Sequence, residues 1–226
     1  MLTPFSTIYG LDDQPLVDYQ GQKMEHATAE QFIAMQAAAT KDGFALAICS
    51  SYRSLDRQLA IWNAKACGER RLLDCNSQPL DASTLNDQQL VDAILIWSAL
   101  PGTSRHHWGT DIDIFDANQI TKRDLQLVSH EYQAGGPCYS LSKWLARYSE
   151  DFGFYLPFQA GKSGVSPEPW HLSYFPMANR CLSQFDSNTL NAILATKPMQ
   201  LKEAVLPRLE KLVAEYVFRV APSPSN

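Results

Sequence analysis

The sequence predicts a single domain of the α+β class, because helical and strand patterns are intermixed along it without regular alternation. At 226 residues the chain is long enough to bury one substantial core, and no repeat, low-complexity tract or linker divides it. Hydrophobic residues make up 45% and charged residues 19% of the sequence, which is typical of a globular protein and too apolar for disorder. We therefore predict one domain over residues 1–226, with a frayed Pro/Ser-rich tail at 221–226.

Three helices and one strand are expected in the first hundred residues. The helices cover a segment from Ala29 to the residues before Gly43, then 55–66 and 86–100. Thr28 with Gln31 forms a capping-box pattern for the first helix, and Ser54 can cap the second. The run 44–50 is short, apolar and bounded by turn residues, which indicates a buried strand. The polar stretch 68–83 predicts irregular structure.

The second half of the chain continues this mixture of elements. Strict alternation of apolar and polar residues predicts a strand over 110–115. Further strands are expected at 170–175 and 216–220, and helices at 140–153, 188–196 and 199–214. Pro207 should interrupt or kink the last of these helices, because proline lacks an N–H and clashes with the preceding turn.

Charge and hydropathy exclude two classes of partner. The formal net charge of -5 shows no excess of basic residues of the kind that nucleic-acid-binding proteins carry. No stretch approaches the roughly 20 apolar residues of a membrane span. The N-terminus lacks a basic start followed by an apolar run, so we expect a cytoplasmic protein.

The five cysteines are scattered, odd in number and without CxxC spacing, which favours reduced thiols. A bridge between Cys67 and Cys75 is the alternative, and it would suit a periplasmic location instead.

Histidine and carboxylate residues gather in two short segments. In the predicted strand 110–115, Ile112 and Ile114 form the core face, whereas Asp111 and Asp113 lie on the opposite face. Two carboxylates there need a paired, solvated or metal-bound setting, since burying an isolated charge is costly. Gly109 allows a sharp turn, so that His106 before the turn can converge on the aspartates after it.

The second segment is Glu168-Pro-Trp-His171. Imidazole and carboxylate are ligands that zinc accepts, and three protein ligands leave a fourth position for water, as in catalytic sites. Zinc lowers the pKa of such water to roughly 7. Glu168 can act as a general base beside a ligand, and Arg53 at a strand–helix junction can clamp a carboxylate.

Three ordered motifs together resemble the VanY-type D-alanyl-D-alanine carboxypeptidases and dipeptidases, whose fold is shared with hedgehog domains. The motifs are Tyr52-Arg53-Ser54, Ser104-x-His106-x-x-Gly109-x-x-x-Asp113 and Glu168-x-Trp170-His171. The resemblance implies a small central antiparallel sheet flanked by helices. It implies a Zn²⁺ ion held by His106, Asp113 and His171.

The same resemblance implies a role for each remaining site residue. Glu168 would be the general base and acid, and Arg53 would polarise the scissile carbonyl or anchor the terminal carboxylate. Ser104 and Gln58 match positions that line the substrate pocket. Asp111 departs from the family pattern, which usually has alanine there; it would orient a ligand, bind a substrate amine or face water.

The predicted function is hydrolysis of the terminal peptide bond in peptidoglycan stem peptides that contain D-amino acids, by a D,D- or L,D-carboxypeptidase. The alternatives are a dipeptidase or endopeptidase of the same family, or a zinc-dependent binding module without catalysis. Retention of both Glu168 and Arg53 favours an enzyme, because a pure binding module needs neither.

Overall fold

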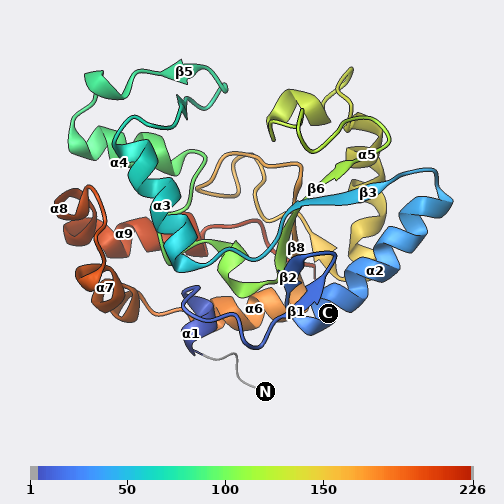
Figure 1. Ribbon diagram of the computed structural model, residues 1–226, viewed down its shortest axis with the longest axis horizontal. Coiled ribbons are helices and arrows are strands. Elements are labelled where there is room, and N and C mark those ends of the chain that lie inside the picture. Colours follow the sequence, from blue (N-terminus) through green and yellow to red (C-terminus); the bar gives the residue numbers. More distant parts are fainter. Residues whose placement is uncertain (1–4, 225–226) are drawn as a thin grey trace.

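A four-stranded antiparallel sheet lies at the centre of the computed structural model, which describes residues 5–224. Its strands run in the order β3 (Leu46–Ser50), β6 (Asp111–Asp116), β8 (His171–Tyr174) and β7 (Phe154–Tyr155). Asp113 on β6 lies opposite Ser50 on one side and His171 on the other. The small antiparallel sheet with flanking helices confirms the predicted α+β fold (Figure 1).

One face of the sheet packs against α2 (His26–Lys41) and α5 (Tyr139–Tyr148), which lie on the same side of it in Figure 1. Ile112 and Ile114 of β6 point into this core and are fully buried. The alternation along β6 therefore places Asp111 and Asp113 on the other face, as the sequence predicts. That face carries the site.

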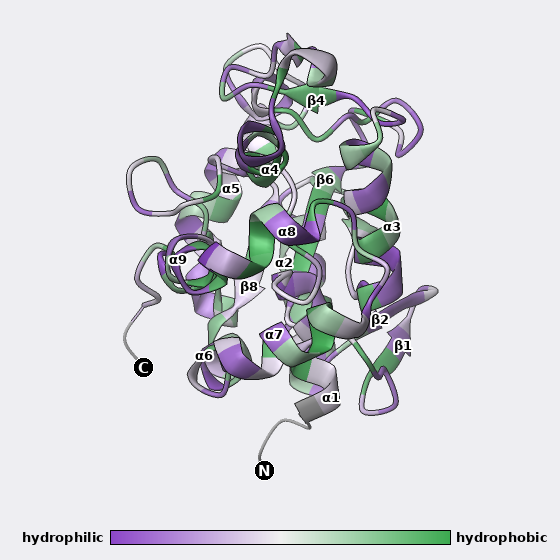
Figure 2. Ribbon diagram, turned by 90° about the vertical axis from the view of Figure 1, so that its left-hand side faces the viewer, coloured by the Kyte–Doolittle hydropathy of each residue, from purple (hydrophilic) through white to green (hydrophobic). Residues whose placement is uncertain are grey.

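Six of the remaining helices form most of a second core beyond that face. They are α3 (Leu55–Ala66), α4 (Asp87–Leu95), α6 (Phe175–Ser183), α7 (Ser187–Thr196), α8 (Lys202–Val205) and α9 (Leu209–Val213). Trp62 and Trp108 are among the largest fully buried side chains of this cluster. The ribbons of α3 and α6 alternate between purple and green in Figure 2, as expected of helices with one face on a core. The site thus lies between a sheet and a helical half.

Several short elements escape prediction because they hold too few residues to show a period. They are α1 (Phe5–Ile8), the hairpin of β1 (Val17–Tyr19) and β2 (Gln22–Met24), and the hairpin of β4 (Leu72–Leu73) and β5 (Pro79–Leu80) within the stretch expected to be irregular. Strand β7, with two residues, is missed for the same reason. Helix α6 is missed because it continues directly from β8 at Phe175, where a strand residue is predicted.

Of the two predicted helix caps, the one at Ser54 is confirmed and the one at Thr28 is wrong. α3 has the predicted bounds, and the Ser54 hydroxyl accepts from the backbone N–H of Arg57. α4 starts after a capping box of Asn86 and Gln89 but ends at Leu95, short of the predicted residue 100. α2 begins three residues before Ala29, because the Glu25 carboxylate rather than Thr28 caps it.

Two predictions for the C-terminal region are wrong and one is confirmed. A 3₁₀ turn at Leu206–Arg208 separates α8 from α9, as expected from Pro207. The predicted strand at 216–220 is instead a π-helical turn, Ala214–Phe218, whose Val217 packs into the helical core. The tail is not frayed at Ala221, which is 1% exposed and donates its N–H to the carbonyl of Pro157; residues 225–226 lie outside the described part.

Two further sequence expectations concern the described residues. None of their helices is both long and apolar enough to cross a membrane. None of the five cysteines forms a disulfide in the described part of the chain, so Cys67 and Cys75 are exposed thiols without a bridge between them.

Candidate metal and catalytic site

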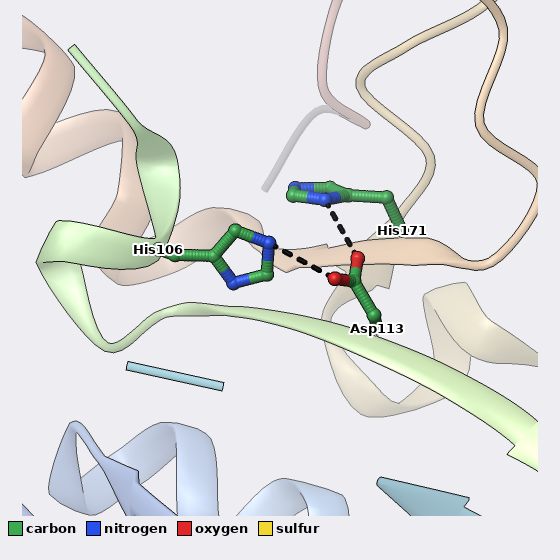
Figure 3. Close-up of side chains that lie close together, drawn as sticks. All are labelled: His106, Asp113 and His171. Carbon is green, nitrogen blue, oxygen red and sulfur yellow. Dashed lines mark hydrogen bonds and ion pairs between the residues drawn. The ribbon is translucent and has the colours of Figure 1, made fainter. Parts of the chain in front are cut away.

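His106, Asp113 and His171 converge from three separate elements (Figure 3). His106 lies on the 3₁₀ turn Arg105–Trp108, Asp113 on β6 and His171 at the start of β8. Gly109 closes the turn with a φ of 70°, a left-handed conformation that glycine adopts without steric cost. One ligand atom of each residue lies within 4.8 Å of the others, so the predicted metal ligands are brought together.

Each of the two imidazole rings directs one nitrogen toward the centre of the cluster. His106 Nδ1 lies 2.8 Å from the carbonyl oxygen of Ser51, which can only accept, so Nδ1 carries the hydrogen. His106 Nε2 is then free, 3.2 Å from Asp113 Oδ2. His171 directs Nδ1 to Asp113 Oδ1 at 3.1 Å. These two nitrogens and the carboxylate are the atoms that a cation would meet.

The donor set fits zinc. Two imidazoles and one carboxylate make a three-ligand set that leaves a coordination position open. All three side chains are at least 93% buried, and all three contribute to the lining of a cavity. Burial by itself lowers the pKa of His171, but hydrogen bonds to Asp111 and Asp113 outweigh it and raise the pKa to about 10. A bound cation would take the place of this proton.

Glu168 lies beside the cluster in the loop that leads into β8. Its carboxylate Oε2 is 3.5 Å from His171 Nδ1, and the backbone turn is held by the His171 N–H, which donates to the Glu168 carbonyl. Burial raises the pKa of Glu168 to about 8, against the opposing effect of His171. A cation at the cluster would lower this pKa again, toward the neutral range where one group can both accept and return a proton.

Arg53 reaches the same site from the end of β3. Its guanidinium donates from Nη1 to Gln58 Oε1 at 2.9 Å and from Nη2 to Ser50 Oγ at 3.2 Å. Gln58 in turn donates to the carbonyl of Ala99 at 2.7 Å, so both ends of its amide are used. Gln58 is fully buried and is absent from the cavity wall; it positions Arg53 rather than lining the pocket as predicted.

His107 is a supporting residue that the sequence reasoning did not identify. It is fully buried, with Nδ1 2.6 Å from the carbonyl oxygen of Arg53 and Nε2 accepting the N–H of Gly102 at 3.1 Å. Burial lowers the pKa of His107 to about 3, so the ring is neutral and its Nδ1–H donates to Arg53. No spacing signal marks this role, because its partners are backbone groups, and that of Arg53 lies 54 positions away in the sequence.

Gly10 packs directly on His107. Its φ is +73°, and a Cβ there would lie 2.4 Å from His107 Nδ1. We expect Gly10→Ala to cost about 1–2 kcal/mol for the left-handed backbone, plus the cost of the clash. It should also displace His107 from the Arg53 carbonyl and so disturb the position of the Arg53 guanidinium in the site. Gly43→Ala is the matched control, because Gly43 has a φ of +89° but nothing within 4 Å. Equal losses of unfolding free energy in urea for both variants would contradict this account.

A cavity of about 380 Å³ opens over the cluster. The cavity is lined by the three predicted metal ligands and also by Glu168, Arg53 and Ser104. Ser104 therefore lies where the sequence predicts. Trp97, Phe158 and Trp170 supply apolar wall, whereas Lys65 and Arg70 add positive charge. Burial lowers the pKa of Lys65 to about 8, with Arg70 acting in the same direction. The cavity therefore combines hydrolytic groups with cations suited to a carboxylate.

Asp111 does not line this cavity. Its side chain is 0% exposed and lies behind His171, where Oδ1 accepts from His171 Nε2 at 2.9 Å and from Arg105 Nε at 2.8 Å. Burial by itself raises the pKa of Asp111, but Arg105 and His171 outweigh it and hold the pKa well below its usual range. The predicted contact with substrate thus finds no support in the geometry, whereas the alternative of orienting a ligand does.

Comparison with known proteins agrees with this arrangement. A family model described as VanY, D-alanyl-D-alanine carboxypeptidase, matches residues 21–177. An uncharacterised Haemophilus influenzae protein is 36% identical over 121 residues, covering 52% of this chain and 92% of its own length. The D-alanyl-D-alanine carboxypeptidase of Enterococcus faecalis is 30% identical over 140 residues. That match covers 61% of this chain but 42% of the relative, so the chain spans less than half of that enzyme.

Two solved structures share the fold. VanYB in complex with D-alanine-D-alanine superposes with a TM-score of 0.54 at 23% identity, covering 80% of this chain and 88% of that one. A mutant of the D,D-pentapeptidase VanY from a VanB-type resistance cassette, in complex with Zn(II), gives a TM-score of 0.52 at 22% identity, covering 84% and 88%. The matched family model includes every predicted ligand and Glu168 within its range. The chain therefore belongs to the VanY family of D-alanyl-D-alanine carboxypeptidases.

Proposed function

We propose that this protein is a zinc-dependent carboxypeptidase that removes the C-terminal D-amino acid from peptidoglycan stem peptides. One observation carries the proposal: the three metal ligands, Glu168 and Arg53 line a single cavity. Hydrolysis by a zinc peptidase requires a metal site and a base that is not a ligand, and a cation near the scissile bond assists it. All three are present there. Their presence favours catalysis over the alternative of a binding module.

Each residue has a defined task in this reaction. Zinc held by His106, Asp113 and His171 would supply Lewis acidity and lower the pKa of a bound water. Glu168, 3.5 Å from His171 Nδ1, takes a proton from the attacking water and returns it to the leaving amine. Arg53 donates a hydrogen bond to the carbonyl oxygen, where negative charge develops. Gln58 and Ser50 hold the guanidinium still while it does so.

The positive wall supports a substrate with a free carboxylate. Lys65 lines the cavity with Arg70 and makes no ion pair or hydrogen bond with any other residue of the described chain. A desolvated ammonium attracts an anion more strongly than an exposed one does. We assign Lys65 and Arg70 to the terminal carboxylate, which leaves Arg53 for the scissile carbonyl. This division of labour suits an exopeptidase.

A panel of stem peptides tests the proposal. The zinc-loaded protein is incubated with a pentapeptide ending in D-Ala-D-Ala, a tetrapeptide ending in one D-Ala, the C-terminally amidated pentapeptide and free D-Ala-D-Ala, and products are identified by mass spectrometry. We expect D-Ala release from the pentapeptide or the tetrapeptide and none from the amide. Cleavage of free D-Ala-D-Ala alone would indicate a dipeptidase, and internal cleavage of the amide an endopeptidase. Tight zinc binding without any cleavage would favour a binding module.

A further inference from the structure

His171 is held at both ring nitrogens, and the two partners differ. Nδ1 faces the cluster, 3.1 Å from Asp113 Oδ1, whereas Nε2 lies 2.9 Å from Asp111 Oδ1 on the side away from the cavity. The outer nitrogen of the other histidine ligand, His106 Nδ1, meets only a neutral carbonyl, that of Ser51. One ligand of the pair therefore carries a buried carboxylate behind it and the other does not.

The Asp111 carboxylate lies in a buried hydrogen-bond network, in which only Nη1 of Arg105 has no hydrogen-bond partner among the described residues. Its Oδ1 also accepts from Arg105 Nε at 2.8 Å, and its Oδ2 accepts from the Thr110 hydroxyl at 2.6 Å. Arg105 Nη2 donates to Ser173 Oγ at 2.7 Å. Asp111, Thr110 and Ser173 are 0% exposed and Arg105 is 4% exposed. A network this deeply buried has no bulk water with which to exchange its hydrogen bonds.

We propose that Asp111 is a positioning residue for the metal, acting through His171, and that Arg105 is its dedicated counter-charge. A carboxylate that accepts from Nε2–H fixes the tautomer in which Nδ1 presents its lone pair to the cluster. The negative charge also makes the imidazole a stronger electron-pair donor. This inference rests on the metal site of the proposed function, and it adds two residues to that site.

The charge balance explains why the two residues occur together. An aspartate in place of the usual small residue would be a buried, unpaired anion without Arg105. Arg105 without Asp111 would be a buried cation without a carboxylate, in contact with the Ser173 hydroxyl, with Tyr155 and with the Trp108 ring 4.6 Å from its Cζ atom. Arg105 and Asp111 lie on either side of Gly109, so the same turn positions the ligand His106 and both members of the ion pair. The pair is therefore part of the metal site rather than a separate surface feature.

Zinc affinity of the Asp111→Asn variant tests the proposal. In this variant Oδ1 still accepts from both donors and the amide nitrogen can face the Thr110 hydroxyl, so size and hydrogen bonding are kept while the charge is lost. Competition with a chromogenic chelator should show zinc binding weakened by roughly 10–100-fold. Cobalt substitution should show a shifted visible absorption spectrum, because the donor strength of His171 has changed. Ser173→Ala, which removes a different hydrogen bond of Arg105, should match the wild type in both measurements.

A second variant covers the possibility that charge loss disturbs folding. The double variant Arg105→Met/Asp111→Ala removes both buried charges, and its zinc affinity should fall by the same roughly 10–100-fold. Wild-type affinity and an unshifted cobalt spectrum in Asp111→Asn would overturn the proposal, as would equal weakening by Ser173→Ala. A wild-type protein that binds zinc tightly but cuts no stem peptide would sink the proposed peptidase function and leave this inference standing.

Discussion

The Glu168→Gln variant is expected to lose kcat by about 10²–10⁴-fold, the usual contribution of a positioned general base. Glutamine has the shape of glutamate but cannot accept the proton of the attacking water. Glu168 is not one of the three residues whose ligand atoms cluster, so the variant should still bind one zinc ion per chain. Turnover is measured as D-Ala release, and metal content by elemental analysis of the same samples.

The pH dependence of the wild type gives an independent test of Glu168. A general base works only when deprotonated, so activity should fall as the pH drops below the pKa of Glu168. That pKa is about 8 without a metal, and a bound cation lowers it. The acidic limb of kcat/KM should therefore lie below pH 8 and should change in Glu168→Gln. Glu30→Gln, on the exposed face of α2, is the control and should leave the profile intact. Turnover at the wild-type rate by Glu168→Gln would refute the assignment.

The second large effect is expected for Arg53→Lys. Lysine keeps the positive charge but lacks the planar fork that donates to Gln58 and Ser50 at once. Loss of one oriented donor to a developing oxyanion typically costs about 10²–10³-fold in kcat. We expect a loss of that size in kcat, with KM little changed. Arg57→Lys provides the control, because Arg57 is exposed on the next turn of the chain.

The kinetic constants of Arg53→Lys also distinguish the two roles that the sequence leaves open. A residue that stabilises charge only in the transition state lowers kcat when it is replaced. A residue that anchors the terminal carboxylate equally in substrate and transition state raises KM instead. A raised KM with unchanged kcat would therefore move Arg53 to the carboxylate and contradict its assignment to the scissile carbonyl.

The candidate metal cluster could be predicted from the sequence because most of its signals are local. Alternation along 110–115 separates Ile112 and Ile114 from the two aspartates, and the structure has the same two faces. The Ser54 cap likewise gives the bounds of α3, since capping depends on neighbouring residues alone. The pairing of Asp113 with His171 is long-range, and here the resemblance of the three motifs supplies what the local pattern does not.

The supporting residues could not be predicted in this way. The roles of Asp111, Gln58 and His107 depend on contacts with groups 5 to 60 positions away, several of them backbone carbonyls. The C-terminal region fails for a related reason: the apolar run near Val217 suits a strand locally, but packing against the helical core makes it a π-helical turn. Glu25, which caps α2, is not one of the usual N-cap residues. The predicted start of this helix at Ala29 is therefore later in the chain than the observed start at His26.

Zinc dependence of D-Ala release tests the central claim most directly. The purified protein is assayed on stem pentapeptide and tetrapeptide as isolated, after removal of metal with a chelator, and after return of zinc, with metal content measured at each stage. We predict that release disappears with the metal and returns when one zinc ion binds per chain. Release at an undiminished rate from metal-free protein would contradict the assignment of His106, Asp113 and His171 as the ligands of a catalytic metal.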